Sequence, residues 1–174
     1  YSLKKPKRAR EASVSSAWWM TMCGILSQVS QRPLGFQRFQ TALDSLQSRG
    51  PDGRGSWLSP DGRVALGHRR LAIVDPEGGQ QPCQDETGEI VAVVNGEFYG
   101  HALLRLQLMG QGVRFRSHSD SELLVHLYRH YGVNCLSFLR GEFAWILYDT
   151  RQQRLLAARD GYGIKPLEIG RAHV

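Results

Sequence analysis

The sequence MCGILSQV, residues 22–29, is the best guide to the architecture of this chain, because a cysteine here precedes a short β-strand pattern. A strand would hold Cys23 at the end of a rigid element, where a reactive side chain is well positioned. Removal of Met22 would leave Cys23 with both a thiol and a free α-amine. Their reference pKa values are about 8.5 and about 7.7–8.0, so both groups exchange protons near neutrality. Cys23 could then be nucleophile and general base at once, like an N-terminal threonine nucleophile. Alone, the motif also fits a small buried cysteine.

Downstream of this strand, apolar spacing and turn signals predict further helices and strands. Phe39 and Leu43 are spaced for one face of a helix that would end at Gly50, and Ser119 with Glu122 forms a predicted capping box. Short turns rather than crossover helices join the predicted strands, which is typical of an α+β fold with antiparallel sheets. The other expected elements are strands at residues 64–67, 71–74 and 90–94, helices at 101–109 and 119–131, and a hairpin of strands 143–149 and 155–159.

The positive charge of the chain is concentrated at its beginning. The net charge is +6, but residues 1–22 contribute +4 through five Lys/Arg and one Glu, so the remainder is not notably basic. The segment KKPKRAR, residues 4–10, could be a nuclear-localisation or polyanion-binding tail. We instead expect residues 1–22 to be a non-native or disordered basic extension, with the natural start at Met22 or Met20 and no role in nucleic-acid binding.

The end of the chain is also atypical. Residues 168–174, EIGRAHV, back-translate into a string that resembles a common sequencing adapter. We expect them to be an artefactual tail that truncates the gene, so the folded domain should span residues 23–167. At 174 residues with 41% apolar content, the chain is long enough for one domain with a real core.

The three cysteines indicate a reducing compartment. Cys23, Cys83 and Cys135 include no close pair, and no secretory signal precedes them, so we expect a cytoplasmic protein without a disulfide framework. Cys83 and Cys135 fit inert packing positions. No apolar run approaches the length of a membrane span, so no membrane association is expected.

Five further segments supply partners for a reactive cysteine, and together with MCGIL they resemble the glutaminase domain of glutamine-dependent asparagine synthetase. They are RGPD (49–52), HRRLAIVD (68–75), NGEFYG (95–100), SDSE (119–122) and ARDGYGIKPL (158–167). The resemblance covers residues 23–167, in the same order and at similar spacings. It implies the four-layer αββα sandwich of N-terminal-nucleophile hydrolases, here truncated at its C-terminal end.

The resemblance also implies a reaction. The Cys23 sulfur would attack the side-chain amide of L-glutamine, release ammonia and form a thioester that water hydrolyses. The side-chain amide of Asn95 and the backbone N–H of Gly96 match the oxyanion hole of the family, where loss of one donor typically lowers turnover by about 10²- to 10³-fold. The competing interpretation of Asn95-Gly96 is a type I′ hairpin turn, for which this dipeptide is the commonest signal.

The motifs imply binding residues for a free amino acid. Arg70 matches the arginine that clamps the α-carboxylate, and its planar fork can bind bidentately. Asp120 and Glu97 match the carboxylates that receive the α-ammonium, while Ile73 and Val74 would lend backbone groups. Asp120 also has a purely structural interpretation, because acids stabilise the first turn of a helix in any protein.

Other polar residues receive structural predictions. Arg49 and Asp52 are expected to order the loop around the nucleophile, and Arg69 to face solvent. His126 and His130, four residues apart on one helix, could hold zinc by spacing, but no third ligand accompanies them. We therefore expect a solvated helix face there and no metal in this domain.

The resemblance further implies partners. No cofactor is expected for the glutaminase domain, whereas a C-terminal synthetase domain, absent from these residues, would use ATP and magnesium to adenylate aspartate and accept the ammonia. A homodimer is left open.

Some residues depart from the family pattern. Phe98, Gly100, Gly161 and Tyr162 replace residues of NGEIYN and ARDRFGIKPL. These changes leave the assigned donors intact, but a specialised asparagine-synthetase-like amidotransferase and a catalytically inactive binding fragment remain alternatives. The segment HRRLAIVD followed by GGQQP favours the asparagine synthetase pattern over amidophosphoribosyltransferase or glucosamine phosphate synthase.

Overall fold

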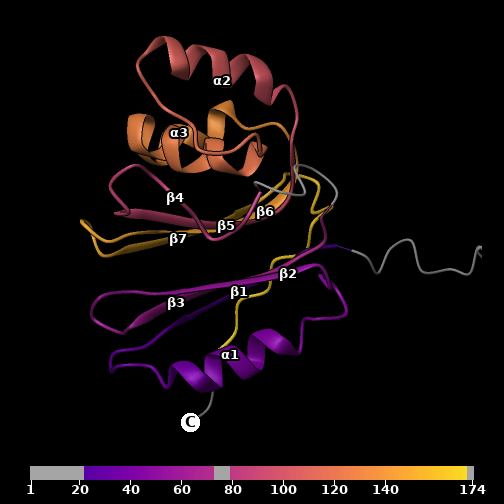
Figure 1. Ribbon diagram of the computed structural model, residues 1–174, viewed down its shortest axis with the longest axis vertical. Helices are drawn as coiled ribbons and strands as arrows, with labels where there is room; N and C mark the ends of the chain where they lie inside the picture. Colours follow the sequence, from indigo (N-terminus) through magenta and orange to yellow (C-terminus); the bar gives the residue numbers. More distant parts are fainter. Residues whose placement is uncertain (1–21, 73–78, 172–174) are drawn as a thin grey trace, which may run out of the picture.

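Two antiparallel sheets packed face to face form the centre of the molecule, with helices on the outer face of each (Figure 1). This computed structural model describes residues 22–72 and 79–171. The layers follow one another as helices α2 and α3, the four-stranded sheet, the three-stranded sheet and helix α1 (Figure 1). The predicted α+β class with antiparallel sheets is confirmed. Residues 1–21 of the predicted basic extension, 73–74 of a predicted strand and 172–174 of the predicted tail lie outside the described residues.

The three-stranded sheet carries the start of the domain. Its order is β1-β3-β2, with β1 at Gly24–Val29, β2 at Gly53–Leu58 and β3 at Val64–Arg70. Helix α1, Phe36–Asp44, buries Phe39 and Leu43 against this sheet, as their spacing predicted. A Cβ at Gly67 of β3 would come within 2.8 Å of the Leu43 side chain, so the missing side chain lets the helix lie close to the central strand.

The four-stranded sheet carries the larger core. Its order is β4-β5-β6-β7, with strands at Cys83–Gln84, Ile90–Phe98, Gly141–Asp149 and Arg154–Arg159. Helices α2 (His101–Gly110) and α3 (Leu123–Tyr131) and the 3₁₀ segments η1 (Asp120–Glu122) and η2 (Gly132–Phe138) connect β5 to β6. The hairpin predicted at residues 143–159 is confirmed in β6 and β7.

Strand β5 is buried on both faces, because it lies between the helices and the other sheet. Ile90, Ala92 and Val94 belong to the cluster under the helices. Val91 and Val93 pack instead with Val64, Leu66, Ile146 and Tyr148 in the second cluster. Double-sided burial explains the continuous apolar run IVAVV, which is typical of an interior strand. By the same alternation, Asn95 follows Val91 and Val93 on the face toward the three-stranded sheet.

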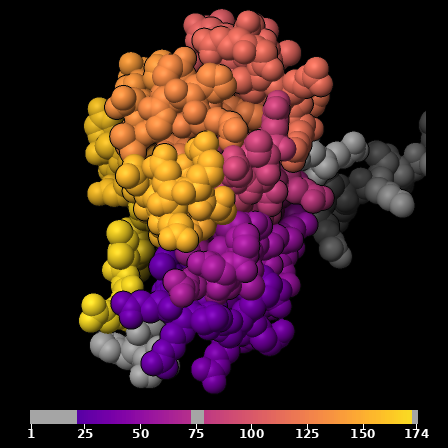
Figure 2. Space-filling view, turned by 90° about the vertical axis from the view of Figure 1, so that its left-hand side faces the viewer, coloured from indigo at the N-terminus to yellow at the C-terminus, as the bar shows by residue number. Residues whose placement is uncertain are grey.

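After β7 the chain passes from the four-stranded sheet to the three-stranded sheet (Figures 1 and 2). Residues 166–170 line a hollow along β1, together with Leu155 and Ala157 of β7. In Figure 2 this final segment, coloured yellow, runs down one side of the molecule from the upper layers toward the indigo N-terminal part. Residues 166–170 thereby lie close to β1, the first described strand.

Several sequence predictions are wrong or incomplete. The strand expected at 64–67 continues to Arg70 as β3, whereas Leu71 and Ala72 of the strand expected at 71–74 form no strand. The capping box is half formed: the Ser119 side chain accepts from the Ser121 amide, but the Glu122 carboxylate accepts from the Arg116 and Ser117 amides. Glu122 therefore closes the preceding loop rather than the helix start.

The predicted solvent-facing positions also need correction. His126 is 3% exposed, with Nε2 3.4 Å from Glu122 Oε1, whereas His130 is exposed as expected. Arg69 is 7% exposed rather than solvated, because α1 covers its face of β3 and places Asp44 Oδ1 3.7 Å from its Nη1. Within the described residues, no group of three or more His, Cys, Asp or Glu side chains is arranged to hold a metal ion. No described helix has both the length and the apolar character needed to cross a membrane.

Candidate active site

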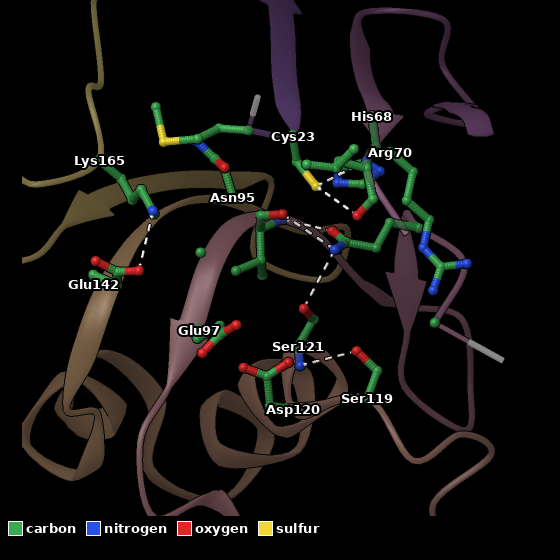
Figure 3. A pocket seen from close by; sticks show the side chains of 16 residues that line it. Cys23, His68, Arg70, Asn95, Glu97, Ser119, Asp120, Ser121, Glu142 and Lys165 are labelled. Carbon is green, nitrogen blue, oxygen red and sulfur yellow. Dashed lines mark hydrogen bonds and ion pairs between the residues drawn. The ribbon is translucent and has the colours of Figure 1, made fainter. Parts of the chain in front are cut away.

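A pocket between the two sheets gathers most of the residues that the motifs singled out (Figure 3). Its walls come from the residues before β1, the end of β3, the loop before β4, the second half of β5, segment η1, the start of β6 and the loop after β7. The lining residues are Met22, Cys23, His68, Arg70, Leu71, Gly79, Gln81, Val94, Asn95, Gly96, Glu97, Ser119, Asp120, Ser121, Glu142 and Lys165. Seven segments of the chain therefore meet in the pocket that holds the Cys23 sulfur.

Cys23 lies immediately before β1, with its side chain in this pocket (Figure 3). The Leu71 amide lies 3.4 Å from Sγ as a donor, and the Leu71 carbonyl oxygen lies 3.7 Å from Sγ as an acceptor. Burial raises the pKa of the Cys23 thiol above its ordinary value, while the backbone hydrogen bond to Leu71 and the positive charges of Arg70 and Lys165 oppose that rise. The thiol thus lies in a desolvated place with two cations nearby.

Asp52 orders the segment beside the sulfur. Its Oδ2 accepts a hydrogen bond of 2.9 Å from the Ala72 amide, and its own amide donates to the Arg70 carbonyl oxygen at 2.9 Å. These two bonds hold the chain as it leaves β3 toward Leu71, the direct neighbour of Sγ. The loop-ordering role predicted for Asp52 is confirmed, and Arg49 lies with Cys23 along the adjoining hollow.

Asn95 and Gly96 lie inside strand β5, opposite Ala144 and Phe143 of β6. The hairpin-turn interpretation is therefore wrong, because no turn occurs at this dipeptide. Gly96 has φ +127°, and a Cβ there would overlap the carbonyl oxygen of Glu142. Only glycine fits this close approach, which leaves the backbone of Gly96 accessible at the pocket wall.

The predicted substrate-binding charges lie in the same pocket, with the carboxylates apart from the arginine. Arg70 ends β3 and is largely buried, and in Figure 3 it lies to the right of the sulfur. Glu97 and Asp120 lie next to each other below it, and the Asp120 carboxylate accepts a hydrogen bond of 2.6 Å from the Phe98 amide. Ile73 and Val74, predicted to lend backbone groups, lie outside the described residues.

The sequence motifs did not predict a role for Gln81, whose side chain links strand β5 to segment η1. Gln81 Oε1 accepts from the Val94 amide at 2.6 Å, and Nε2 donates to the Val94 carbonyl at 3.1 Å and to Ser121 Oγ at 3.3 Å. A Cβ at Gly55 would overlap the Gln81 carbonyl oxygen, so this glycine permits the loop to approach β2. The segment GGQQP contained the signal, although its spacing alone assigned no contact to Gln81.

His68 was assigned no catalytic role, and it is a deeply buried wall of the pocket. Its side chain is 1% exposed, and its Nε2 has no hydrogen-bond partner among the described residues. Burial lowers the pKa of His68 to about 4, a fall that its hydrogen bond to the Val94 backbone opposes. The imidazole is therefore neutral at physiological pH.

Glu142 and Lys165 complete the wall on the other side of the sulfur (Figure 3). Lys165 Nζ lies 3.2 Å from Glu142 Oε1, and both side chains are partly buried. Lys165 belongs to the motif ARDGYGIKPL, which could have pointed to it, but the sequence assigned no role to any residue of that motif.

Comparisons with known proteins agree with this geometry. Residues 22–173 match the family model described as a glutamine amidotransferase domain. Amidase chry2 of Gibberella zeae is 48% identical over 132 residues, which cover 75% of this chain and 20% of that protein. Asparagine synthetase [glutamine-hydrolyzing] 2 of Oryza sativa subsp. japonica is 40% identical over 152 residues, which cover 86% of this chain and 25% of that protein.

A solved structure shares the fold. Glutamine phosphoribosylpyrophosphate amidotransferase from B. subtilis aligns with a TM-score of 0.58 and 25% identity, covering 74% of this chain and 35% of that one. The present chain spans about a fifth to a quarter of the length of the two curated relatives. Because the family match extends across the two sheets and the pocket between them, the chain belongs to the glutamine amidotransferase domain family.

Proposed function

We propose that this chain hydrolyses L-glutamine to glutamate and ammonia through a thioester on Cys23, in a fold of the N-terminal-nucleophile hydrolase type. One observation carries the proposal: the sulfur shares a single pocket with the donors at Asn95 and Gly96 and with charges suited to a zwitterion. Asn95 and Gly96 follow one another on the strand beside the sulfur, where an oxyanion hole requires donors.

The first half-reaction needs a terminal Cys23. Once the preceding residues are removed, the α-amine takes the thiol proton and the sulfur attacks the amide carbon of the substrate. A C–S bond forms, and the carbonyl oxygen becomes an oxyanion that the Asn95 side chain and the Gly96 amide stabilise. Collapse of this intermediate breaks the C–N bond, and the α-ammonium returns the proton to the departing ammonia.

The second half-reaction consumes water. The α-amine accepts a proton as water attacks the thioester carbonyl, and the same oxyanion donors act again. Cleavage of the C–S bond releases glutamate, and the sulfur recovers a proton. Throughout, Arg70 would hold the α-carboxylate of the substrate, with Glu97 and Asp120 receiving the α-ammonium. Ile73 and Val74 are proposed to lend backbone groups to the substrate.

The test compares two N-termini. A chain begun at Met22 is expected to lose that methionine, shown by intact mass, and to release ammonia from glutamine. The 174-residue chain, whose Cys23 nitrogen lies in a peptide bond, is expected to be slower by at least about 10²-fold, the usual contribution of a general base. An electrophilic glutamine analogue should label Cys23 only in the first form. Equal ammonia release by both forms, with masses that show residues 1–22 intact, would contradict the mechanism.

The ammonia acceptor is a separate proposal. We infer aspartate, activated by ATP and magnesium in a synthetase domain outside this chain, because asparagine synthetases match over 152 residues. A second candidate is a specialised amidase, favoured by the higher identity of 48% to amidase chry2. The whole protein that contains this chain, given glutamine, aspartate, ATP and magnesium, should form asparagine at a rate that matches glutamate release. Glutamate release without asparagine would favour the second candidate.

A further inference from the structure

Two glutamates on adjacent strands are neighbours in the wall of the pocket. Glu97 of β5 and Glu142 of β6 are paired directly opposite one another in the antiparallel register, and both line the pocket. Like charges at directly opposed positions destabilise a sheet. Lys165 Nζ, 3.2 Å from Glu142 Oε1, compensates one of them. Glu142 is therefore paired with Lys165, whereas Glu97 lies beside Asp120 (Figure 3).

The loop that carries Lys165 is held in place by Asp160. The Asp160 carboxylate accepts hydrogen bonds from the amides of Tyr162, Ile164 and Lys165, at 3.0, 3.0 and 3.1 Å. The Asp160 amide also donates to the Phe143 carbonyl oxygen at 2.8 Å, next to Glu142 on β6. Burial alone would raise the pKa of Asp160, yet these backbone hydrogen bonds hold it at about 2, so the carboxylate remains ionised at neutral pH.

Lysine is rare in this domain. Lys165 is the sole lysine from residue 22 to residue 174, where every other strongly basic residue is arginine. Its side chain is 12% exposed, so its charge acts where water screens it poorly.

We propose that Lys165 is a positioning residue that keeps a positive charge in the pocket that holds the Cys23 sulfur, while Glu142 anchors it there. A nearby cation favours the thiolate, the reactive form of a cysteine. Within residues 22–72 and 79–171, the other charged or titratable side chains that line this pocket are Arg70, His68, Glu97, Asp120 and Glu142. His68 is neutral, and the proposed function assigns Arg70 to the substrate carboxylate. With substrate bound, Lys165 then remains, among the lining residues that the structure describes, as the cation that acts on the sulfur.

The catalytic meaning of this inference rests on the proposed function, but the effect on the sulfur is measurable without it. The readout is the rate at which iodoacetamide alkylates Cys23 in the 174-residue chain as pH is varied. Cys83 and Cys135 stay silent, because burial raises the pKa of Cys83 to about 12 and that of Cys135 to about 11. The measured profile therefore reports the Cys23 thiol alone.

The two members of the ion pair should act in opposite directions. Lys165→Met removes the cation and leaves Glu142, so the thiol pKa should rise and alkylation at pH 7 should slow by about three- to tenfold. Glu142→Gln removes the anion and leaves the cation, so alkylation should become faster by about two- to fivefold. Lys165→Arg keeps the charge and should remain within about twofold of the parent.

If the ion pair were purely structural, Lys165→Met and Glu142→Gln would change the alkylation rate in the same direction, because each would loosen the same wall of the pocket. Equal-sign effects of Lys165→Met and Glu142→Gln, or no change in either, would overturn the inference. If Lys165→Met fails to fold, shown by circular dichroism, Glu142→Gln must still speed alkylation. Shifted alkylation without any ammonia release from chains with a terminal Cys23 would refute the proposed function and leave this inference standing. Ammonia release by chains with a terminal Cys23, together with unshifted alkylation in the variants, would refute this inference and leave the proposed function standing.

Discussion

Replacing Cys23 by alanine is expected to lower ammonia release from glutamine by at least about 10³-fold, since loss of a nucleophile removes the covalent route altogether. The fold should persist, because the thiol is only partly buried and its contacts of 3.4 and 3.7 Å with Leu71 are weak. The measurement is glutamate and ammonia production by chains begun at Met22, with thermal unfolding measured in parallel.

The matched control is a second cysteine, Cys83→Ala, at a buried position in the core under the helices. It should cost stability by leaving a small cavity but keep ammonia release close to that of the parent. Normal glutamine hydrolysis by Cys23→Ala would dispose of the thioester mechanism. Equal loss in both variants would point to unfolding rather than chemistry.

Gly96→Ala is expected to destabilise the domain by more than about 3 kcal/mol, which for a domain of this size lowers the Tm by roughly 10 °C. Two costs combine at this position. A φ of +127° is unfavourable for a residue with a side chain, and the new Cβ would overlap the Glu142 carbonyl oxygen. Relief of the overlap would push β5 from β6 and displace the Gly96 amide from the pocket, so ammonia release should also fall.

Gly100→Ala separates these two costs. Gly100 also has a positive φ, +70°, but nothing lies within 4 Å of the position where its Cβ would be. Its alanine variant should therefore lose only about 1 kcal/mol, from backbone strain. Thermal unfolding of the two variants measures the difference between their losses of stability. Equal losses would show that the close approach of Gly96 to Glu142 does not contribute to the effect of Gly96→Ala.

Regular elements of the fold could be predicted where a strong local pattern agreed with the tertiary environment. The β6–β7 hairpin and the helix that buries Phe39 and Leu43 follow directly from their apolar spacing. Strand β2, GRGSWL, was missed because two glycines and little apolar alternation hide it, and its pairing with β3 supplies what its sequence lacks. His126 and Arg69 were misplaced because local periodicity does not report which further layers cover a face.

Only those residues of the candidate site that belong to a recognisable sequence motif could be predicted. Cys23, Arg70, Asn95 and Asp120 were found because each belongs to a short segment with its own chemical logic. Lys165, by contrast, acquires its place through Glu142 on another strand, and no spacing in the sequence links the two. Asn95-Gly96 shows the converse difficulty: the dipeptide suits a turn locally, and only its partners on β6 place it inside a strand.

The route of the chain after β7 has a consequence for biosynthesis. The sulfur lies just before strand β1, whereas the ammonium in its pocket arrives with the loop that follows β7. A nascent polypeptide on the ribosome therefore carries its thiol long before the residues that tune it have been translated. Full reactivity of the thiol should therefore appear only after the loop that carries Lys165 has emerged, and not grow gradually with chain length.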